Sequence, residues 1–171
     1  MIESALTGDY FEDMVLNQLL NWPGAKVQHF FFDGKPIPLA RQRSAAIKTA
    51  FGKYRAIAFS PKKNVQEKDR IYTCCLNQKP VRFEPPYTTA IKFICEPLKT
   101  VREDYPTAAT HGDFDNLTKL ILDALFFDMG PKAKRGIPIY QDDRHIINAL
   151  IFKRLPVGDD KPGIHFWMVK P

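Results

Sequence analysis

The chain reads His111-Gly112-Asp113-Phe114-Asp115-Asn116-Leu117-Thr118-Lys119 just before a run of apolar residues with helical spacing. Asp113 and Asp115 are two positions apart, so an extended backbone points both carboxylates to the same side. Asp115 or Asn116 can also cap the helix that follows. Two carboxylates about 4 Å apart repel each other by about 4 kcal/mol at an effective dielectric of about 20. A fold that gathers several of these acids therefore predicts a divalent metal ion between them.

The helix predicted after this acidic stretch has an apolar face, which consists of Leu117, Leu120, Ile121, Ala124 and Leu125. Gly130-Pro131 ends the pattern. Lys119 follows Asp115 by one helical turn, so its ammonium group can stabilise phosphate charge or pair with Asp115 or Asp123. The sequence leaves both roles of Lys119 open.

A second acidic pair, Asp142-Asp143, stands at the start of a strongly apolar strand pattern. The helix carries the chain about 20 Å away from Asp115. An extended segment over residues 136–142 covers the same distance in return, at about 3.3 Å per residue. We therefore expect Asp143 to rejoin Asp113 and Asp115, with residues 129–135 as a loop at the far end of the helix.

Composition limits the class of protein. A chain of 171 residues with 44% hydrophobic residues is long enough for one domain with a real core. The net charge of +6 fits either a nucleic acid partner or general solubility. No apolar run approaches the roughly 18 residues of a membrane span, and the N-terminus lacks a signal-peptide pattern. Cys74, Cys75 and Cys95 form no CxxC pair, which is typical of a reduced, cytoplasmic protein without structural zinc.

Two helices are predicted before the acidic stretch. The first lies within residues 1–22 and ends at Pro23-Gly24. It can serve as a docking or partner-binding segment, but simple packing is favoured. The second runs from Ser60-Pro61 to Leu76, with Ser60 as its cap and Pro61 in its first turn.

Strands are predicted over residues 27–32, 87–95, 145–155 and 164–169. Alternation in residues 87–95 indicates a half-buried strand, and near-continuous apolarity in residues 145–155 indicates a central one. The last strand is expected to pair back onto the sheet. Together these patterns predict an α+β fold: one domain with a mixed β-sheet packed against helices and an extra N-terminal helix.

Residues 26–70 carry most of the excess positive charge, since the acids there are only Asp33, Glu67 and Asp69. Phe51, Tyr54 and Phe59 are interleaved with the basic residues. For any single residue, a solvated face with inward aromatics is the better interpretation. As a region, the imbalance favours contact with a sugar–phosphate backbone, and the candidate DNA-binding residues are Arg41, Arg43, Lys53 and Arg55.

These motifs resemble the RusA-type Holliday junction resolvases, a family of crossover junction endodeoxyribonucleases. The resemblance is carried by residues 113–119 and 122–125, then Tyr140-Gln141-Asp142-Asp143 and Lys153. It extends upstream to Gly34-Lys35-Pro36-Ile37-Pro38 and Arg41-Gln42-Arg43, so it covers about residues 27–155. Residues 1–26 and 129–135 have no counterpart in the family pattern. We therefore expect an accessory N-terminal segment (1–26) and a RusA-like endonuclease domain (27–171).

The resemblance implies that Asp113, Asp115 and Asp143 are catalytic metal-binding acids and that Lys119 is a catalytic or DNA-contacting lysine. Asp142 has a lesser role in the family pattern, and Lys153 matches a recurrent basic position. The family implies a small homodimer that needs Mg²⁺, with Mn²⁺ as a substitute, and cuts four-way DNA junctions by paired nicks in recombination and repair. It also implies an origin in a phage or other mobile element.

The chemistry agrees with this resemblance. Mg²⁺ binds one or two carboxylates together with waters and substrate phosphate, and two symmetric nicks call for the two sites of a C2 dimer. His111 and His145 can be ligands, general bases or bystanders; bystander is favoured, with His111 the stronger candidate for a role. Two other functions stay open: a non-catalytic DNA-binding or assembly protein of this fold, and a nuclease for flaps or forks.

Overall fold

The β-sheet is organised around strand β4 (Tyr87–Ile94), in which every residue is buried. The strand order is β1 (Lys26–Asp33), β6 (Gly163–Lys170), β4 and β5 (Ile146–Arg154). β4 pairs antiparallel with β6 and parallel with β5, so the sheet is mixed, as predicted. This computed structural model describes residues 8–40, 43–59, 61–99, 105–107, 111–125, 139 and 143–170.

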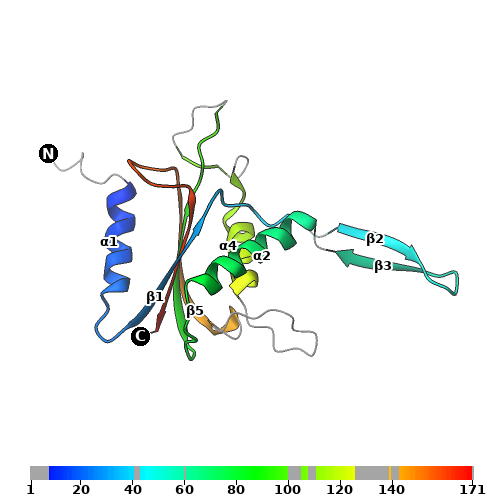
Figure 1. The fold of residues 1–171 in the computed structure, drawn as a ribbon, viewed down its shortest axis with the longest axis horizontal. Coiled ribbons are helices and arrows are strands. Elements are labelled where there is room, and N and C mark those ends of the chain that lie inside the picture. The colour runs from blue at the N-terminus through cyan, green and yellow to red at the C-terminus, as the bar shows by residue number, and fades with distance from the viewer. Residues whose placement is uncertain are drawn as a thin grey trace.

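Helices cover both faces of the sheet (Figure 1). Helices α2 (Lys62–Asn77) and α4 (Phe114–Leu125) pack on one face, where the main core lies. Phe30, Phe32, Phe93 and Phe166 from the sheet meet Leu117, Leu120 and Ile121 from α4 in this core. The prediction of one α+β domain is therefore confirmed, and no helix in the described part of the chain is long and apolar enough to cross a membrane.

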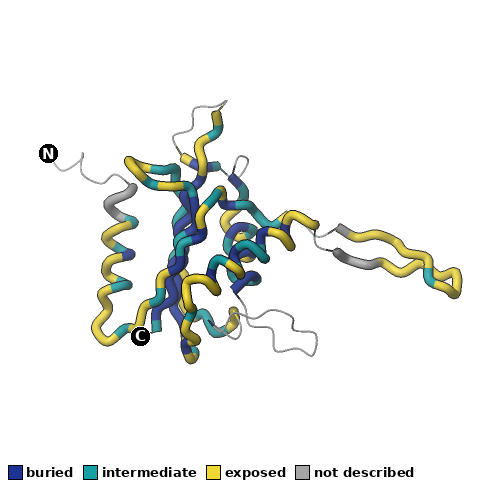
Figure 2. Tube along the Cα trace, in the orientation of Figure 1, coloured by how far each residue is buried: buried dark blue, intermediate teal, exposed yellow. Residues whose placement is uncertain are grey.

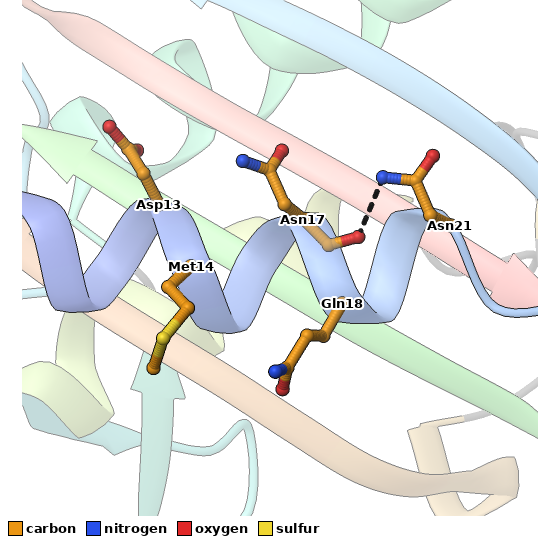
Figure 3. A pocket seen from close by; sticks show the side chains of 5 residues that line it. All are labelled: Asp13, Met14, Asn17, Gln18 and Asn21. Carbon is orange, nitrogen blue, oxygen red and sulfur yellow. Dashed lines mark hydrogen bonds between the residues drawn. The ribbon is translucent and has the colours of Figure 1, made fainter.

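Helix α1 (Gly8–Leu20) lies on the opposite face, on the left in Figure 1. Leu16 is buried there against Ala90 and Trp167, and the Lys92 ammonium is 3.1 Å from an Asp13 carboxylate oxygen. On the exposed side of α1, Asp13, Met14, Asn17, Gln18 and Asn21 line a pocket of about 470 Å³ (Figure 3). The predicted N-terminal helix is present and packs on the sheet; the division at residue 26 stays a prediction.

Three predictions about the elements are wrong in detail. β4 is fully rather than half buried, because α1 covers the face that alternation had assigned to solvent. β5 is an edge strand rather than a central one; its continuous apolarity reflects Leu150 packing toward α1 and Ile151 packing toward the main core. Pro61 occupies the cap position of α2 instead of the first turn, and Ser60 lies outside the described residues.

The largest difference is a two-stranded ribbon that the sequence did not predict. β2 (Arg43–Lys48) and β3 (Tyr54–Phe59) pair antiparallel and project away from the body of the molecule (Figure 1). Its outer part is exposed (Figure 2). At the ribbon's base, the Asn64 side chain accepts a hydrogen bond from the Ala40 amide (3.0 Å) and donates one to the Ala40 carbonyl (2.8 Å). Residues 43–59, one part of the predicted basic region 26–70, thus form a separate arm.

Candidate active site

The acidic stretch forms the start of helix α4 rather than an extended strand. The Asp113 carbonyl accepts a hydrogen bond from the Leu117 amide at 3.1 Å, so Asp113 occupies the cap position and Asp115 lies in the first turn. The helix begins earlier than the expected caps at Asp115 or Asn116. Side chains two positions apart on a helix do not face each other. The extended backbone predicted from Asp113 to Asp115 is therefore wrong, and with it the reason for expecting both carboxylates on one side.

The turn before α4 is held by residues from elsewhere in the chain. Gly112 has φ +85°, and a Cβ built there would overlap the ring of Pro38, whose Cγ would be 2.7 Å away. The Leu39 amide donates to the Asn116 carbonyl at 3.2 Å. Pro38, at the end of the Gly34–Pro38 segment, thus packs against Gly112 in the turn before α4, and Leu39 next to it is hydrogen-bonded to Asn116.

Lys153 fixes the same turn from strand β5. Its ammonium group donates to the Gly112 carbonyl at 2.9 Å and lies 5.1 Å from the centre of the Phe114 ring. Both contacts hold the lysine at the rim of the acidic site, since a cation over an aromatic face is attracted to it. Lys153 therefore has a positioning role as well as a positive charge.

The two histidines beside the acids make structural contacts. His111 is buried, and its Nε2 donates to the Glu96 carbonyl at 2.9 Å. His145 lies in a short 3₁₀ turn, η1 (Asp143–His145), with its ring edge-on to Tyr87 at 6.4 Å between centroids. Neither residue lines the two pockets described next.

Two neighbouring pockets contain the predicted acids and lysines. The first, of about 530 Å³, is lined by Phe114, Asp115, Thr118, Lys119, Leu122, Asp123, Asp143 and Ile151. The second, of about 460 Å³, is lined by Tyr105, Pro106, Asp113, Phe114 and Lys153. Phe114 belongs to both. The structure thus brings Asp115, Lys119 and Asp143 into one pocket and places Asp113 with Lys153 in the next.

The pocket chemistry fits a divalent cation held by few protein ligands. Within the described residues, no three acids, histidines or cysteines form a ready-made metal cluster, so Asp113, Asp115 and Asp143 do not converge as expected. Asp142 lies outside those residues. Asp115 and Asp143 nevertheless line one pocket, and Mg²⁺ takes only one or two carboxylates with waters and phosphate as its other ligands. The carboxylates present are sufficient for such an ion.

Asp123, the third acid of the first pocket, has a structural partner. Its carboxylate is 2.7 Å from the ammonium group of Lys68, which joins α4 to α2. Both side chains are about 30% exposed, so the pair contributes modestly to stability. Sequence spacing had offered Asp123 as a partner for Lys119. The ion pair with Lys68 joins residues that are far apart in the sequence, so local spacing could not predict it.

Other reactive side chains lie away from this chemistry. Burial raises the pKa of the Cys75 thiol to about 12, so Cys75 supplies no thiolate nucleophile near neutral pH. On the sheet face opposite the main core, His29 and His165 stack near Trp167, and burial lowers the pKa of His165 to about 4. These rings are neutral near pH 7 and add no cation for a phosphate.

The predicted DNA-contacting residues fall into two groups. Lys53 and Arg55 are exposed on the ribbon, and Arg43 begins β2. Lys119 and Lys153 line the two pockets. Arg41 lies outside the described residues. Residues 43–48 lack the alternating apolar pattern of a half-buried strand, so periodicity did not predict the ribbon that carries the first group.

One family model matches the chain: Endodeoxyribonuclease RusA, over residues 33–166. The matched range includes the ribbon, both pockets and Lys153, whereas helix α1 lies before it. No curated protein matches the chain.

Proposed function

Since the chain belongs to the RusA endodeoxyribonuclease family, we propose that it is a Mg²⁺-dependent endonuclease that resolves four-way DNA junctions by paired nicks. The observation that carries the proposal is the placement of Asp115, Lys119 and Asp143 in one pocket. Two acids from distant parts of the chain beside a lysine suit phosphodiester hydrolysis. Recombination and repair of DNA are the processes that such an activity serves.

Asp115 and Asp143 are the proposed ligands of the metal ion, while Asp113 lines the adjoining pocket and adds negative charge beside it. When bound, Mg²⁺ or its substitute Mn²⁺ supplies a Lewis acid that neutralises charge on the scissile phosphate and activates a water. The position of Asp115 in the first turn of α4 is electrostatically favourable, because the helix dipole stabilises a carboxylate there.

The two lysines have different proposed roles. Lys119 is exposed one turn after Asp115, and its ammonium group stabilises the charge that develops on the phosphate during cleavage. Lys153 holds the Gly112 carbonyl and so maintains the position of Asp113. Phe114, between the two pockets, provides an apolar wall against which the DNA strand rests.

DNA is held by positive charge outside the pockets. Arg43, Lys53 and Arg55 of the ribbon are the proposed phosphate contacts, with Arg41 beside them in the sequence. Two symmetric nicks need two active sites, which a C2 homodimer of this chain supplies. Affinity that comes from phosphate contacts falls steeply as salt concentration rises.

The first prediction tests the acids. Asp115→Asn removes one carboxylate without changing the side-chain shape, so nicking of a synthetic four-way junction in Mg²⁺ should fall by a factor of about 100 or more. Junction binding should be retained, because the change removes a negative charge beside DNA. Rates of nicking and gel-shift affinities measure the two effects separately.

Asp159→Asn is the matched control, since it makes the same change at an exposed turn before β6 and should leave nicking intact. Wild-type protein that binds junctions but never nicks them with Mg²⁺ or Mn²⁺ would be a DNA-binding module instead. Comparison of junction, fork and flap substrates separates a resolvase from a nuclease for other branched DNA.

A further inference from the structure

Phe51 stands at the outermost turn of the β2–β3 ribbon with 92% of its surface exposed. The turn is well formed. The Thr49 amide donates to the Lys53 carbonyl at 2.7 Å, and the Gly52 amide donates to the Thr49 carbonyl at 2.9 Å. Gly52 has φ +73°, a conformation that glycine adopts without strain. A hydrogen-bonded turn therefore presents the phenyl ring to solvent.

Phe51 is accompanied by other exposed apolar side chains on the same ribbon. Tyr54 is 73% exposed and Ile47 is 49% exposed. The register places Tyr54 on the face of Lys48 and Ile47 on the opposite face, so the tip ring of Phe51 is flanked by an exposed apolar side chain on each face of the arm. None of the three contributes to the main core or to the cluster beneath α1.

The positive charge of the ribbon favours an anionic binding partner. Residues 43–59 include Arg43, Lys48, Lys53 and Arg55 and contain no acid. The ribbon of a second copy would carry the same charge and repel this one. DNA offers complementary phosphates, and base faces that stack on an aromatic ring.

The register of the ribbon places small side chains together on one face, next to Lys48 and Tyr54. Lys48 pairs with Tyr54 and Ala46 with Ala56, so Ser44, Ala46 and Ala56 share a face behind Tyr54. Small side chains let a two-stranded ribbon approach DNA closely, and such a ribbon fits the major groove. Because Phe51 stands at the tip of the ribbon, its ring would enter the DNA first.

We propose that Phe51 is a wedge that stacks on a base at the branch point of the DNA, while Lys48, Lys53 and Arg55 contact the flanking phosphates. This inference rests on the proposed function, since it requires branched DNA as the substrate. In an intact duplex both faces of a base are covered by its neighbours. At a branch point the stacking is interrupted, and an apolar side chain enters at lower cost.

The test compares Phe51→Ala with Phe51→Trp and with Trp22→Ala. Trp22 is 60% exposed and follows α1, a helix that lies on the other side of the body from the ribbon (Figure 1), so Trp22→Ala removes an exposed aromatic ring outside the ribbon. Dissociation constants for a four-way junction and for a duplex are measured without divalent metal, so that binding is separated from cleavage. Fluorescence of 2-aminopurine at the branch point, or within an arm, reports unstacking of that base.

Phe51→Ala should weaken junction binding by about 5- to 150-fold, the effect of losing one base–aromatic stack. Its duplex affinity should match that of the wild type. The fluorescence change at the branch point should disappear with Phe51→Ala and persist with Phe51→Trp, and Trp22→Ala should behave as wild type. Lys53→Ala should instead weaken junction and duplex binding alike and lower the salt slope by about 1.

Equal junction affinity and equal branch-point fluorescence for wild type and Phe51→Ala overturn the wedge and leave the proposed function intact. A wild-type protein that binds no branched DNA overturns both. A third adverse result is a change in the sedimentation of free Phe51→Ala, which would make the ribbon tip an interface between protein chains.

Discussion

Gly112 shows how much one residue contributes to the geometry of the acids. The Pro38 ring occupies the space that a Cβ at Gly112 would need, and the Lys153 ammonium donates a hydrogen bond to the Gly112 carbonyl. A side chain at this position has to overcome both a left-handed backbone and an overlap with a proline ring. The turn that sets Asp113 before α4 is therefore restricted to glycine.

Gly112→Ala is predicted to lower the free energy of unfolding by about 2–4 kcal/mol and to reduce nicking, because the acidic turn must shift. Gly24→Ala is the matched control. Gly24 has a similar φ of +80°, but a Cβ there would have no atom within 4 Å, so only about 1 kcal/mol of backbone strain is expected. Urea unfolding of both variants measures the difference. Equal losses would mean that the Pro38 contact contributes nothing.

At this scale the sequence predicted which residues lie near one another better than it predicted how each is placed. Asp115, Lys119 and Asp143 were predicted to lie together, and all three line one pocket. Asp113 was predicted to join them and lines the neighbouring pocket instead. The reason is the early start of α4: one residue of helix more or less rotates a side chain by about 100°. Asp113, Asp115 and Asn116 are all residue types that cap helices, so the local pattern did not single out Asp113 as the cap.

At the scale of elements, periodicity located most helices and strands but not their neighbours. Strand β5 was predicted to be central because its residues are almost continuously apolar, whereas sheet order depends on pairings that a local pattern does not contain. The ribbon was missed because Arg43–Lys48 is rich in small and charged residues. Its antiparallel pairing, rather than burial, holds it together.

Helix α1 gives a prediction about an element outside the matched family range. Leu16 is 6% exposed and packs on Ala90 and Trp167, so Leu16→Ala should lower the free energy of unfolding by about 2–4 kcal/mol. Met14→Ala, on the same helix but 40% exposed, should change it by less than about 0.5 kcal/mol. Urea unfolding distinguishes them. If both variants match wild type, α1 is a detachable docking segment rather than part of the fold.

At the scale of the whole molecule, the proposed cleavage and the proposed DNA binding belong to different parts, the pockets and the ribbon. Asp115 and Lys119 are part of α4 and share a pocket with Asp143, whereas the cationic ribbon projects from the body (Figure 1). The described part of one chain therefore contains one pocket with Asp115 and Asp143 and one cationic arm. Paired nicking calls for a second copy related by twofold symmetry.

A mixed dimer of one wild-type and one Asp115→Asn chain, purified with two different tags, tests this arrangement. It should nick a four-way junction in one strand and accumulate nicked junctions, because the second site is inactive. The wild-type dimer, tagged in the same way, should release paired duplex products. Denaturing and native gels of the same reaction separate these products. Paired products from the mixed dimer would contradict two independent sites.

The pairing of β1 with β6 has a consequence for how the protein is made. Lys26 pairs with Lys170, so β1 cannot pair in the sheet until β6 has been synthesised. During synthesis, Phe30 and Phe32 leave the ribosome long before Ile164 and Phe166 are available to cover them beside β6. Contacts so distant along the chain form slowly. The nascent protein should therefore depend on chaperones until residues 163–170 emerge, and the sheet should close as a late, cooperative event.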